Sequence, residues 1–315
     1  MTFVLLALAL AAGAPRYDAT WAAALPAGDT PLPAGVYAGP WTLPRGVHLL
    51  ATPGAVLAGG DPVLTIGGDG VRVEGLTVRA TGVGISARGV HALTLEADAV
   101  TGGTQAIYAG EAELRVIGSS LSGSDYGLLA FRTVLLLQEV RVFHVARTGF
   151  GIVRSTGTIE GCSFEGPFFE AAISVVGSNR LTLRHNRVRH AGAIGLKLVS
   201  STGELFDNVV AGARSDPRGL EGDDVYAFAS TLRSQRDSMT DATGTGLTVL
   251  GGTATVTGCT IADAGQAAVY VGETGHLELV GCTVDGAPAG LVVEPGATAL
   301  ARETKFLHVG GDGGV

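Results

Sequence analysis

A repeat of about 22 residues is the feature that most constrains how this chain can fold. The segment Gly-Cys-Thr-Ile at residues 258–261 recurs as Gly-Cys-Thr-Val at 281–284 and as Gly-Cys-Ser-Phe at 161–164. The apolar residue that ends this segment has counterparts along most of the chain: Leu57, Val78, Val100, Leu121, Val142, Phe164, Val188, Val210, Met239, Ile261, Val284 and Phe306. Their successive spacings are 21, 22, 21, 21, 22, 24, 22, 29, 22, 23 and 22 residues. A near-constant period of this length is typical of solenoids, so we predict stacked coils over nearly the whole chain.

Short strand patterns within each period favour an all-β solenoid. Residues 84–86, 127–129 and 195–197 are examples, and none of the flanking sequence shows helical periodicity, which argues against a βαβ fold. The leucine-rich repeat consensus is also absent. Glycine accounts for 49 of 315 residues, which suits tight corners that need a positive φ. Three short strands and three turns per period close a parallel β-helix, and twelve coils about 4.8 Å apart predict a rod roughly 50–55 Å long.

The position two residues before each repeating apolar residue carries a small polar or sulfur side chain. These residues are Asp98, Ser119, Cys162, Asn186, Asn208, Asp237, Cys259, Cys282 and Thr304. Stacked side chains of this kind can bond to the turn backbone of the next coil, so we predict a ladder there. Cys259 and Cys282 lie on successive coils, which leaves open either two stacked thiols or a disulfide.

Several N-terminal segments resemble the right-handed parallel β-helix proteins of the pectate-lyase-like superfamily. They are LPAGVY at 32–37, GVHL at 46–49, PGAVL at 53–57 and GVRVEGLTV at 70–78. The resemblance covers roughly residues 30–310 and implies a single right-handed parallel β-helix of about 11–12 coils. That superfamily contains lyases, glycoside hydrolases, uronan epimerases, esterases and non-catalytic adhesins, so the resemblance leaves the activity open.

The chain divides into three predicted parts. An apolar run at residues 3–12, too short to cross a bilayer and followed by small residues, predicts a signal peptide over 1–13. Residues 14–56 are predicted to form an N-terminal cap and first coil, and residues 57–315 the β-helix. We therefore expect a secreted, periplasmic or cell-surface protein without a membrane span. The net charge of −8 argues against a nucleic-acid partner.

The one long interval, 29 residues between Val210 and Met239, marks a charged loop insertion at residues 213–224. Insertions in solenoids often lie on the binding face, although a charge-rich solvated loop explains the same pattern. The loop carries Arg214, Asp216, Arg218, Glu221, Asp223 and Asp224, in a chain with only 16% charged residues.

Register places Lys197 and Tyr226 as outward neighbours on adjacent coils beside this insertion, and His190 in the turn before the Lys197 strand. This set fits proton abstraction next to the carboxylate of a uronate in an acidic polysaccharide, by a lyase or an epimerase. In this hypothesis Lys197 or His190 is the base and Tyr226 protonates the leaving oxygen. The predicted carboxylate-binding residues are Arg189, Arg214 and Arg218.

Other roles and functions remain open from sequence. Asp216, Asp223 and Asp224 are oxygen donors suited to Ca²⁺, and Tyr108 and Tyr270 face outward, where they can stack on sugar rings. A glycoside hydrolase using Asp223 and Asp224 as its acid and base is an alternative, but adjacent strand residues point to opposite faces. A non-catalytic carbohydrate-binding, adhesive or structural envelope rod is the other alternative.

Overall fold

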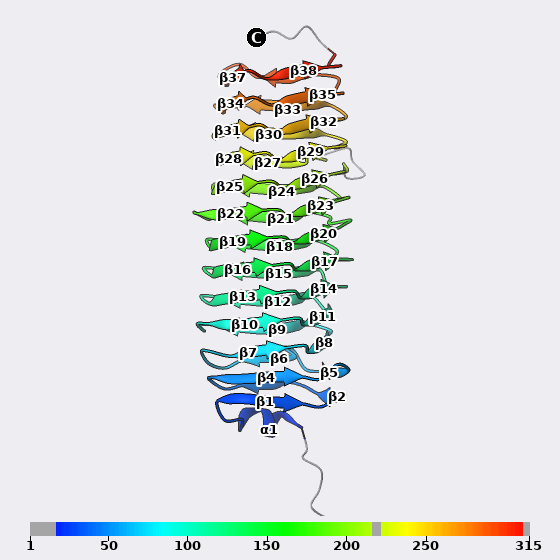
Figure 1. Cartoon of the computed structure of the whole chain (residues 1–315), viewed down its shortest axis with the longest axis vertical. Coiled ribbons are helices and arrows are strands. Elements are labelled where there is room, and N and C mark those ends of the chain that lie inside the picture. Colours follow the sequence, from blue (N-terminus) through cyan, green and yellow to red (C-terminus); the bar gives the residue numbers. More distant parts are fainter. Residues whose placement is uncertain (1–16, 216–221, 311–315) are drawn as a thin grey trace, which may run out of the picture.

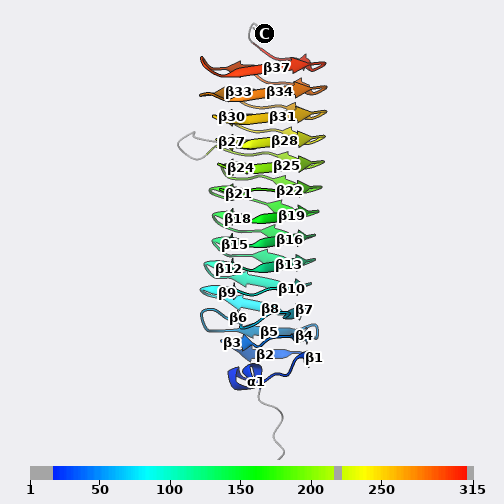
Figure 2. The same ribbon diagram turned by 90° about the vertical axis from the view of Figure 1, so that its left-hand side faces the viewer.

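The computed structural model describes residues 17–215 and 222–310. It is a rod of stacked coils, with the short helix α1 (Ala19–Ala23) at one end and β38 (Lys305–Leu307) at the other (Figures 1 and 2). Each coil contributes one strand to each of three parallel sheets, which contain 13, 13 and 12 strands. The predicted all-β fold with a repeat of about 22 residues is therefore confirmed, and thirteen strands about 4.8 Å apart correspond to a length of about 58 Å.

Sheet A and sheet B each take one strand from every coil. Sheet A comprises β1 (Gly28–Leu32), β4 (Val47–Ala51), β7 (Arg72–Glu74), β10 (Leu93–Glu96), β13 (Glu113–Ile117), β16 (Val134–Gln138), β19 (Thr156–Glu160), β22 (Leu181–Arg184), β25 (Thr202–Phe206), β28 (Thr231–Gln235), β31 (Thr253–Thr257), β34 (His276–Val280) and β37 (Thr298–Arg302). Sheet B comprises β2 (Gly35–Ala38), β5 (Ala55–Ala58), β8 (Thr77–Ala80), β11 (Ala99–Gly102), β14 (Ser120–Ser122), β17 (Arg141–Phe143), β20 (Ser163–Glu165), β23 (Arg187–Arg189), β26 (Val209–Ala211), β29 (Ser238–Thr240), β32 (Thr260–Ala262), β35 (Thr283–Asp285) and β38.

Sheet C carries most of the residues discussed below. It comprises β3 (Trp41–Leu43), β6 (Leu64–Ile66), β9 (Val83–Arg88), β12 (Gln105–Gly110), β15 (Tyr126–Phe131), β18 (Thr148–Val153), β21 (Ala171–Val176), β24 (Ile194–Val199), β27 (Val225–Phe228), β30 (Thr245–Leu250), β33 (Ala267–Gly272) and β36 (Leu291–Val293).

The twelve repeating apolar residues form one column in sheet B. Each pairs in register with the next, from Leu57 and Val78 to Val284 and Phe306. Those from Leu57 to Val284 are buried, because inward positions of adjacent coils stack on like positions and exclude water. Residues that lie one period apart in the sequence are therefore paired on adjacent coils of the structure.

The predicted polar ladder lies beside this column at the corner between sheets A and B. The Asn186 side chain accepts a hydrogen bond from the backbone N–H of Cys162, and Asn208 does the same for Asn186, each at 3.0 Å. Asp237 continues the pattern by accepting from the Asn208 N–H at 2.7 Å. Cys162, Cys259 and Cys282 are buried free thiols, so the structure contains stacked thiols and no disulfide among its described residues.

A second ladder at the corner between sheets C and A was not predicted. The hydroxyl groups of Ser155, Ser178, Ser201 and Ser230 each accept a hydrogen bond from a backbone N–H of the preceding coil, at 3.0 to 3.1 Å. Serine is small enough to fit this inward corner and supplies the acceptor that the turning backbone needs. The two ladders hold successive coils at fixed register on both sides of sheet A.

Aromatic side chains close the N-terminal end of the rod. Asp18 caps α1 by accepting a hydrogen bond from the Trp21 N–H at 2.9 Å. Trp21 packs against Tyr17 and Trp41, with ring centroids 4.7 and 5.4 Å away, and Trp41 is fully buried. The helix thereby covers the apolar interior that the first coil would otherwise expose to water.

Candidate functional site

A single column of outward positions runs along the middle of sheet C. In order along the rod it contains Ser86, Tyr108, Leu129, Gly151, Ser174, Lys197, Tyr226, Thr248, Tyr270 and Val292. The predicted register of Lys197 with Ser174 and Tyr226 is confirmed. Leu196 and Val225 are buried, as the outward placement of their neighbours requires.

Lys197 and Tyr226 form a contact pair within this column. The Nζ atom of Lys197 lies 5.9 Å from the centre of the Tyr226 ring, at the outer limit of a cation–π interaction. Both side chains are half-buried. An amine and a phenol, the two groups proposed as base and acid, therefore lie together on the outer face of β24 and β27.

Glu170 and Arg147 extend this cluster toward the N-terminus. Arg147 donates to the Glu170 carboxylate through Nε at 3.1 Å and also through Nη2, and the Thr148 hydroxyl donates to it at 2.9 Å. Partial burial raises the pKa of Glu170, but the hydrogen bonds from Arg147 and Thr148 and the charges of Arg147 and Lys197 outweigh it. The net pKa of Glu170 therefore lies below its ordinary value, and its carboxylate is held ionised near Lys197.

The sequence analysis missed Glu170 and Arg147 as site residues. They precede the paired residues Thr148 and Ala171, so they occupy the same position on adjacent coils. Counting from the repeating apolar residue, Arg147 follows Val142 by five positions and Glu170 follows Phe164 by six. This extra residue hid their alignment, although the 24-residue interval that begins at Phe164 signalled it.

The adjacent carboxyl groups of Asp223 and Asp224 point in opposite directions. Asp224 is fully buried, where its Oδ1 accepts from the Ala213 N–H at 3.2 Å and its Oδ2 has no hydrogen-bond partner. Burial raises the pKa of Asp224 well above its ordinary value, with the Ala213 hydrogen bond opposing the shift. The Asp223 carboxylate instead accepts from the Thr245 N–H at 2.9 Å and the Thr248 hydroxyl at 2.8 Å. The two groups do not face a common substrate position.

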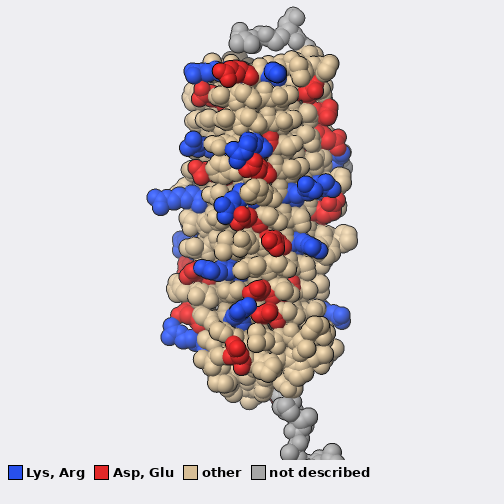
Figure 3. All heavy atoms as spheres, viewed as in Figure 1, with Lys and Arg blue, Asp and Glu red and all other residues tan. Residues whose placement is uncertain are grey.

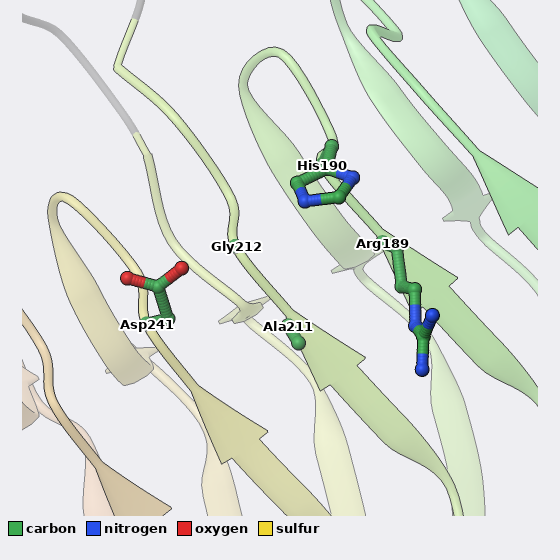
Figure 4. Close-up of a pocket in the computed structure, with 5 residues that line it drawn as sticks. All are labelled: Arg189, His190, Ala211, Gly212 and Asp241. Atoms are coloured by element: carbon green, nitrogen blue, oxygen red, sulfur yellow. The ribbon is translucent and has the colours of Figure 1, made fainter.

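His190 lies in a different place from Lys197, at the corner between sheets B and C. Its Nδ1 is 2.8 Å from Glu165 Oε1, and its φ of 54° is in the left-handed region. It lines a shallow pocket of about 170 Å³ with Arg189, Ala211, Gly212 and Asp241 (Figure 4). The missing side chain at Gly212 opens this space between His190 and Asp241.

Arg214 is held beside this pocket by Asp241, one of the lining residues. It donates to the Asp241 carboxylate through Nη2 at 2.7 Å and to the Asp241 carbonyl through Nη1. The predicted carboxylate-binding residues are thus divided: Arg189 lines the corner pocket, Arg214 is bonded to its residue Asp241, and Arg218 lies outside the described residues. On the face shown in Figure 3, acidic and basic side chains are interleaved.

The remaining predicted positions are spread along sheet C or fall outside it. Tyr108 is four coils from Lys197, and Tyr270 is two coils beyond Tyr226 and hydrogen bonds to Glu294. Asp216 lies outside the described residues. Within residues 17–215 and 222–310, no group of three or more His, Cys, Asp or Glu side chains is arranged to hold a metal ion. The calcium site predicted for Asp216 and Asp223 stays a prediction, because Asp216 is not among the described residues, and no step below depends on it.

The geometry defines a class of protein: a parallel β-solenoid whose sheet C carries the half-buried Lys197 and Tyr226 on its outer face. The right-handed beta helix region family matches residues 63–215 and 171–313, and the chain belongs to this family. No curated protein sequence matches the chain significantly. The helices in the described part of the chain include none that is long and apolar enough to cross a membrane.

Solved structures of similar shape include three polysaccharide-related enzymes. A variant of the periplasmic alginate epimerase AlgG superposes with a TM-score of 0.72 and 12% identity, over 88% of this chain and 78% of the other. The catalytic domain of a GH87 alpha-1,3-glucanase gives 0.66 and 9%, over 86% and 63%. An alginate lyase from Paenibacillus sp. gives 0.54 and 14%, over 89% and 95%. At such identities these likenesses show a shared fold.

Proposed function

We propose that the protein binds an acidic polysaccharide on the outer face of sheet C and modifies it there by proton abstraction next to a uronate carboxylate. The observation that carries this proposal is the Lys197–Tyr226 pair, an amine and a phenol on adjacent coils of a solvent-facing column. Proteins of the same fold named alginate epimerase and alginate lyase support the substrate class.

The two side chains supply complementary proton transfers. Lys197 Nζ, in its neutral form, takes the proton from the carbon beside the carboxylate, and the C–H electron pair delocalises onto that carboxylate. In a lyase, that pair forms a carbon–carbon double bond as the glycosidic C–O bond breaks, and the Tyr226 hydroxyl gives its proton to the leaving oxygen. In an epimerase, the Tyr226 hydroxyl gives its proton to the same carbon from the opposite face of the sugar and is reprotonated by solvent. Both reactions use the same base.

Positive groups near Lys197 would stabilise the negative charge that builds on the substrate carboxylate. Arg147 uses two of its five N–H groups on Glu170, so others remain for a uronate of a neighbouring sugar. Arg189 and Arg214, with Arg218 of the insertion, remain proposed contacts at the adjoining corner. His190 lies at that corner, where it is paired with Glu165, and not in the outward column beside Tyr226. We therefore favour Lys197 over His190 as the base.

The experiment compares wild type with Lys197→Ala and Tyr226→Phe on polymannuronate, polyguluronate and polygalacturonate. Ultraviolet absorbance of unsaturated ends reports lyase activity, and deuterium incorporation from heavy water at the reacting carbon reports epimerase activity. Wild type should give one of these signals, and both variants should lose most of it. Lys305→Ala is the matched control, because Lys305 is the chain's other lysine and lies in the last strand of sheet B.

The same samples distinguish the alternatives. Binding to the polymers with neither signal from wild type would favour a non-catalytic carbohydrate-binding rod. Saturated reducing ends would favour a hydrolase, although the opposed carboxyl groups of Asp223 and Asp224 do not form the pair that reaction uses. We also propose that the protein is exported. Mass spectrometry of the secreted chain should then show an N-terminus close to residue 14.

A further inference from the structure

A second pocket lies on sheet C, far from the Lys197–Tyr226 pair. Arg88, Gly110 and Phe131 are the last residues of β9, β12 and β15 and are paired in register. Together with Gly89, Tyr108 and Glu111 they line a cavity of about 250 Å³. We call this cavity, with its lining residues, the distal pocket.

Gly110 creates the distal pocket by leaving a gap between two large neighbours. Its φ lies outside the left-handed region, so the backbone does not demand glycine there. A Cβ atom at this position would come within 3.1 Å of the Tyr108 hydroxyl. The Tyr108 ring thus lies against Gly110, and a larger side chain between Arg88 and Phe131 would push against this ring and narrow the cavity.

Arg88 is the uncompensated charge of the distal pocket. Its guanidinium carbon lies 4.6 Å from the centre of the Tyr108 ring, and no ion pair to it occurs among the described residues. The acid of the pocket, Glu111, is already paired with Arg132 at 3.1 Å, and Arg132 itself lies over the Phe131 ring at 4.9 Å. A positive group is thus retained at this place in a chain whose net charge is −8.

The stacked guanidinium and the two aromatic rings select one kind of ligand. A guanidinium lying over a ring keeps its N–H edge available for bidentate bonding to a carboxylate. Tyr108 and Phe131 offer apolar surfaces to the C–H face of a sugar ring. A uronate residue carries both groups, because its carboxylate and its apolar ring face belong to one sugar.

The distal pocket and the Lys197–Tyr226 pair lie on the same line along the rod. Tyr108 and Lys197 belong to one outward column and are four coils apart, about 19 Å at the usual strand spacing. The three positions between them are Leu129, Gly151 and Ser174, none of which carries a long polar side chain. An extended polymer can therefore reach both places at once.

We infer that the distal pocket is an anchoring subsite that binds a second uronate of the same polysaccharide chain, several sugars away from the reacting one. This inference rests on the proposed function and adds to it a requirement for chain length. A disaccharide bound at Lys197 cannot reach Arg88, whereas a long oligouronate engages both places. Affinity should therefore rise with length beyond the number of sugars that fills the Lys197 region.

The test is calorimetric titration with purified di-, tetra- and octasaccharides of the polyuronate that wild type binds. Arg88→Ala should weaken octasaccharide binding about tenfold, because the loss of one charge-assisted hydrogen bond changes affinity by about this factor. Disaccharide binding should stay unchanged. Gly110→Leu, which fills the cavity and keeps Arg88, should do the same. Arg233→Ala is the control, because this exposed arginine lies on β28 of sheet A and should change neither affinity.

The outcomes separate this inference from the proposed function. If wild type binds no oligouronate of any length, the proposed function is wrong. If wild type binds them and both variants retain full octasaccharide affinity, the distal pocket is not a subsite and the proposed function stands. An equal loss with the disaccharide and octasaccharide would also overturn the inference, because it would place Arg88 at the reacting end or in the fold.

Discussion

Replacing Asp98 by asparagine should stabilise the protein at pH values where the Asp98 carboxyl is ionised. Asp98 is a buried member of the ladder between sheets A and B, and its Oδ1 accepts from the Leu76 N–H at 2.8 Å. Its Oδ2 is buried without a hydrogen-bond partner. At the equivalent positions, Asn186 and Asn208 use the amide nitrogen to donate to a backbone carbonyl of the preceding coil, at 2.9 Å in each case. Asparagine at position 98 restores this missing donor.

The magnitude follows from two contributions. A net intramolecular hydrogen bond is worth about 1 kcal/mol, and relieving a buried polar atom without a partner is worth about 1–3 kcal/mol. The substitution also changes side-chain packing very little, because the two residues have nearly the same shape. Together these contributions predict that the free energy of unfolding rises by about 2–4 kcal/mol at pH values where the Asp98 carboxyl is ionised.

The effect should depend on pH with a definite sign. Burial raises the pKa of Asp98 well above its ordinary value, against the opposing hydrogen bonds from Leu76 and Glu96. Since the folded pKa exceeds the unfolded one, the folded state binds more protons between them, and wild-type stability falls as pH rises through this window. At lower pH the protonated carboxyl regains a donor, so the advantage of Asp98→Asn should shrink.

Urea unfolding followed by circular dichroism, with hydrogen–deuterium exchange of residues 72–100, measures this difference at several pH values. Asp263→Asn is the matched control, because this exposed aspartate lies outside the ladder and its loss changes the net charge equally. A variant no more stable than wild type at the highest pH measured, or an advantage that does not grow with pH, would refute the reasoning.

Three further predictions test other parts of the account. Gly157→Ala should destabilise the protein strongly, because its Cβ would lie 2.0 Å from the Leu135 carbonyl oxygen. A Cβ at Gly118 would have nothing within 4 Å, so Gly118→Ala should cost only about 1–2 kcal/mol of backbone strain. Thermal melts of the two variants measure this difference. The three buried cysteines should resist a thiol-specific colorimetric reagent in the folded protein and should all react after unfolding. Reaction of any of them in the folded protein would contradict their burial. Glu170→Gln should lower the melting temperature at neutral pH. Because the folded pKa of Glu170 is depressed, that difference should vanish as pH falls through it, and a difference that persists in acid would exclude the Arg147–Glu170 ion pair as its cause.

The coil register could be read from the sequence because burial enforces it. An inward residue such as Val188 must stack on Phe164 and Val210, so its spacing is nearly constant and survives in the sequence. The pairing of Lys197 with Tyr226 followed from the same register across the 29-residue interval. The register shows which outward residues lie on adjacent coils. It does not show which side chains they contact, because packing in the core does not constrain them.

Two site features show where the sequence pattern stops being informative. Glu170 was missed because its coil contains one extra residue before β21, which shifts the buried and outward positions of that strand alike by one relative to Phe164. The direction of the Asp224 side chain depends on the turn that enters β27, where its carboxyl accepts from the Ala213 N–H. Local alternation predicted that Asp223 and Asp224 would diverge, but not which of them would be buried.

The most direct test of the central claim is solvent deuterium incorporation and unsaturated-end formation on polyuronates, for wild type, Lys197→Ala and Lys305→Ala side by side. The account predicts that wild type and Lys305→Ala give the same signal and that Lys197→Ala loses it while still binding the polymer. Equal activity in Lys197→Ala and wild type, or activity lost in both lysine variants, would contradict the assignment of chemistry to the outer face of sheet C.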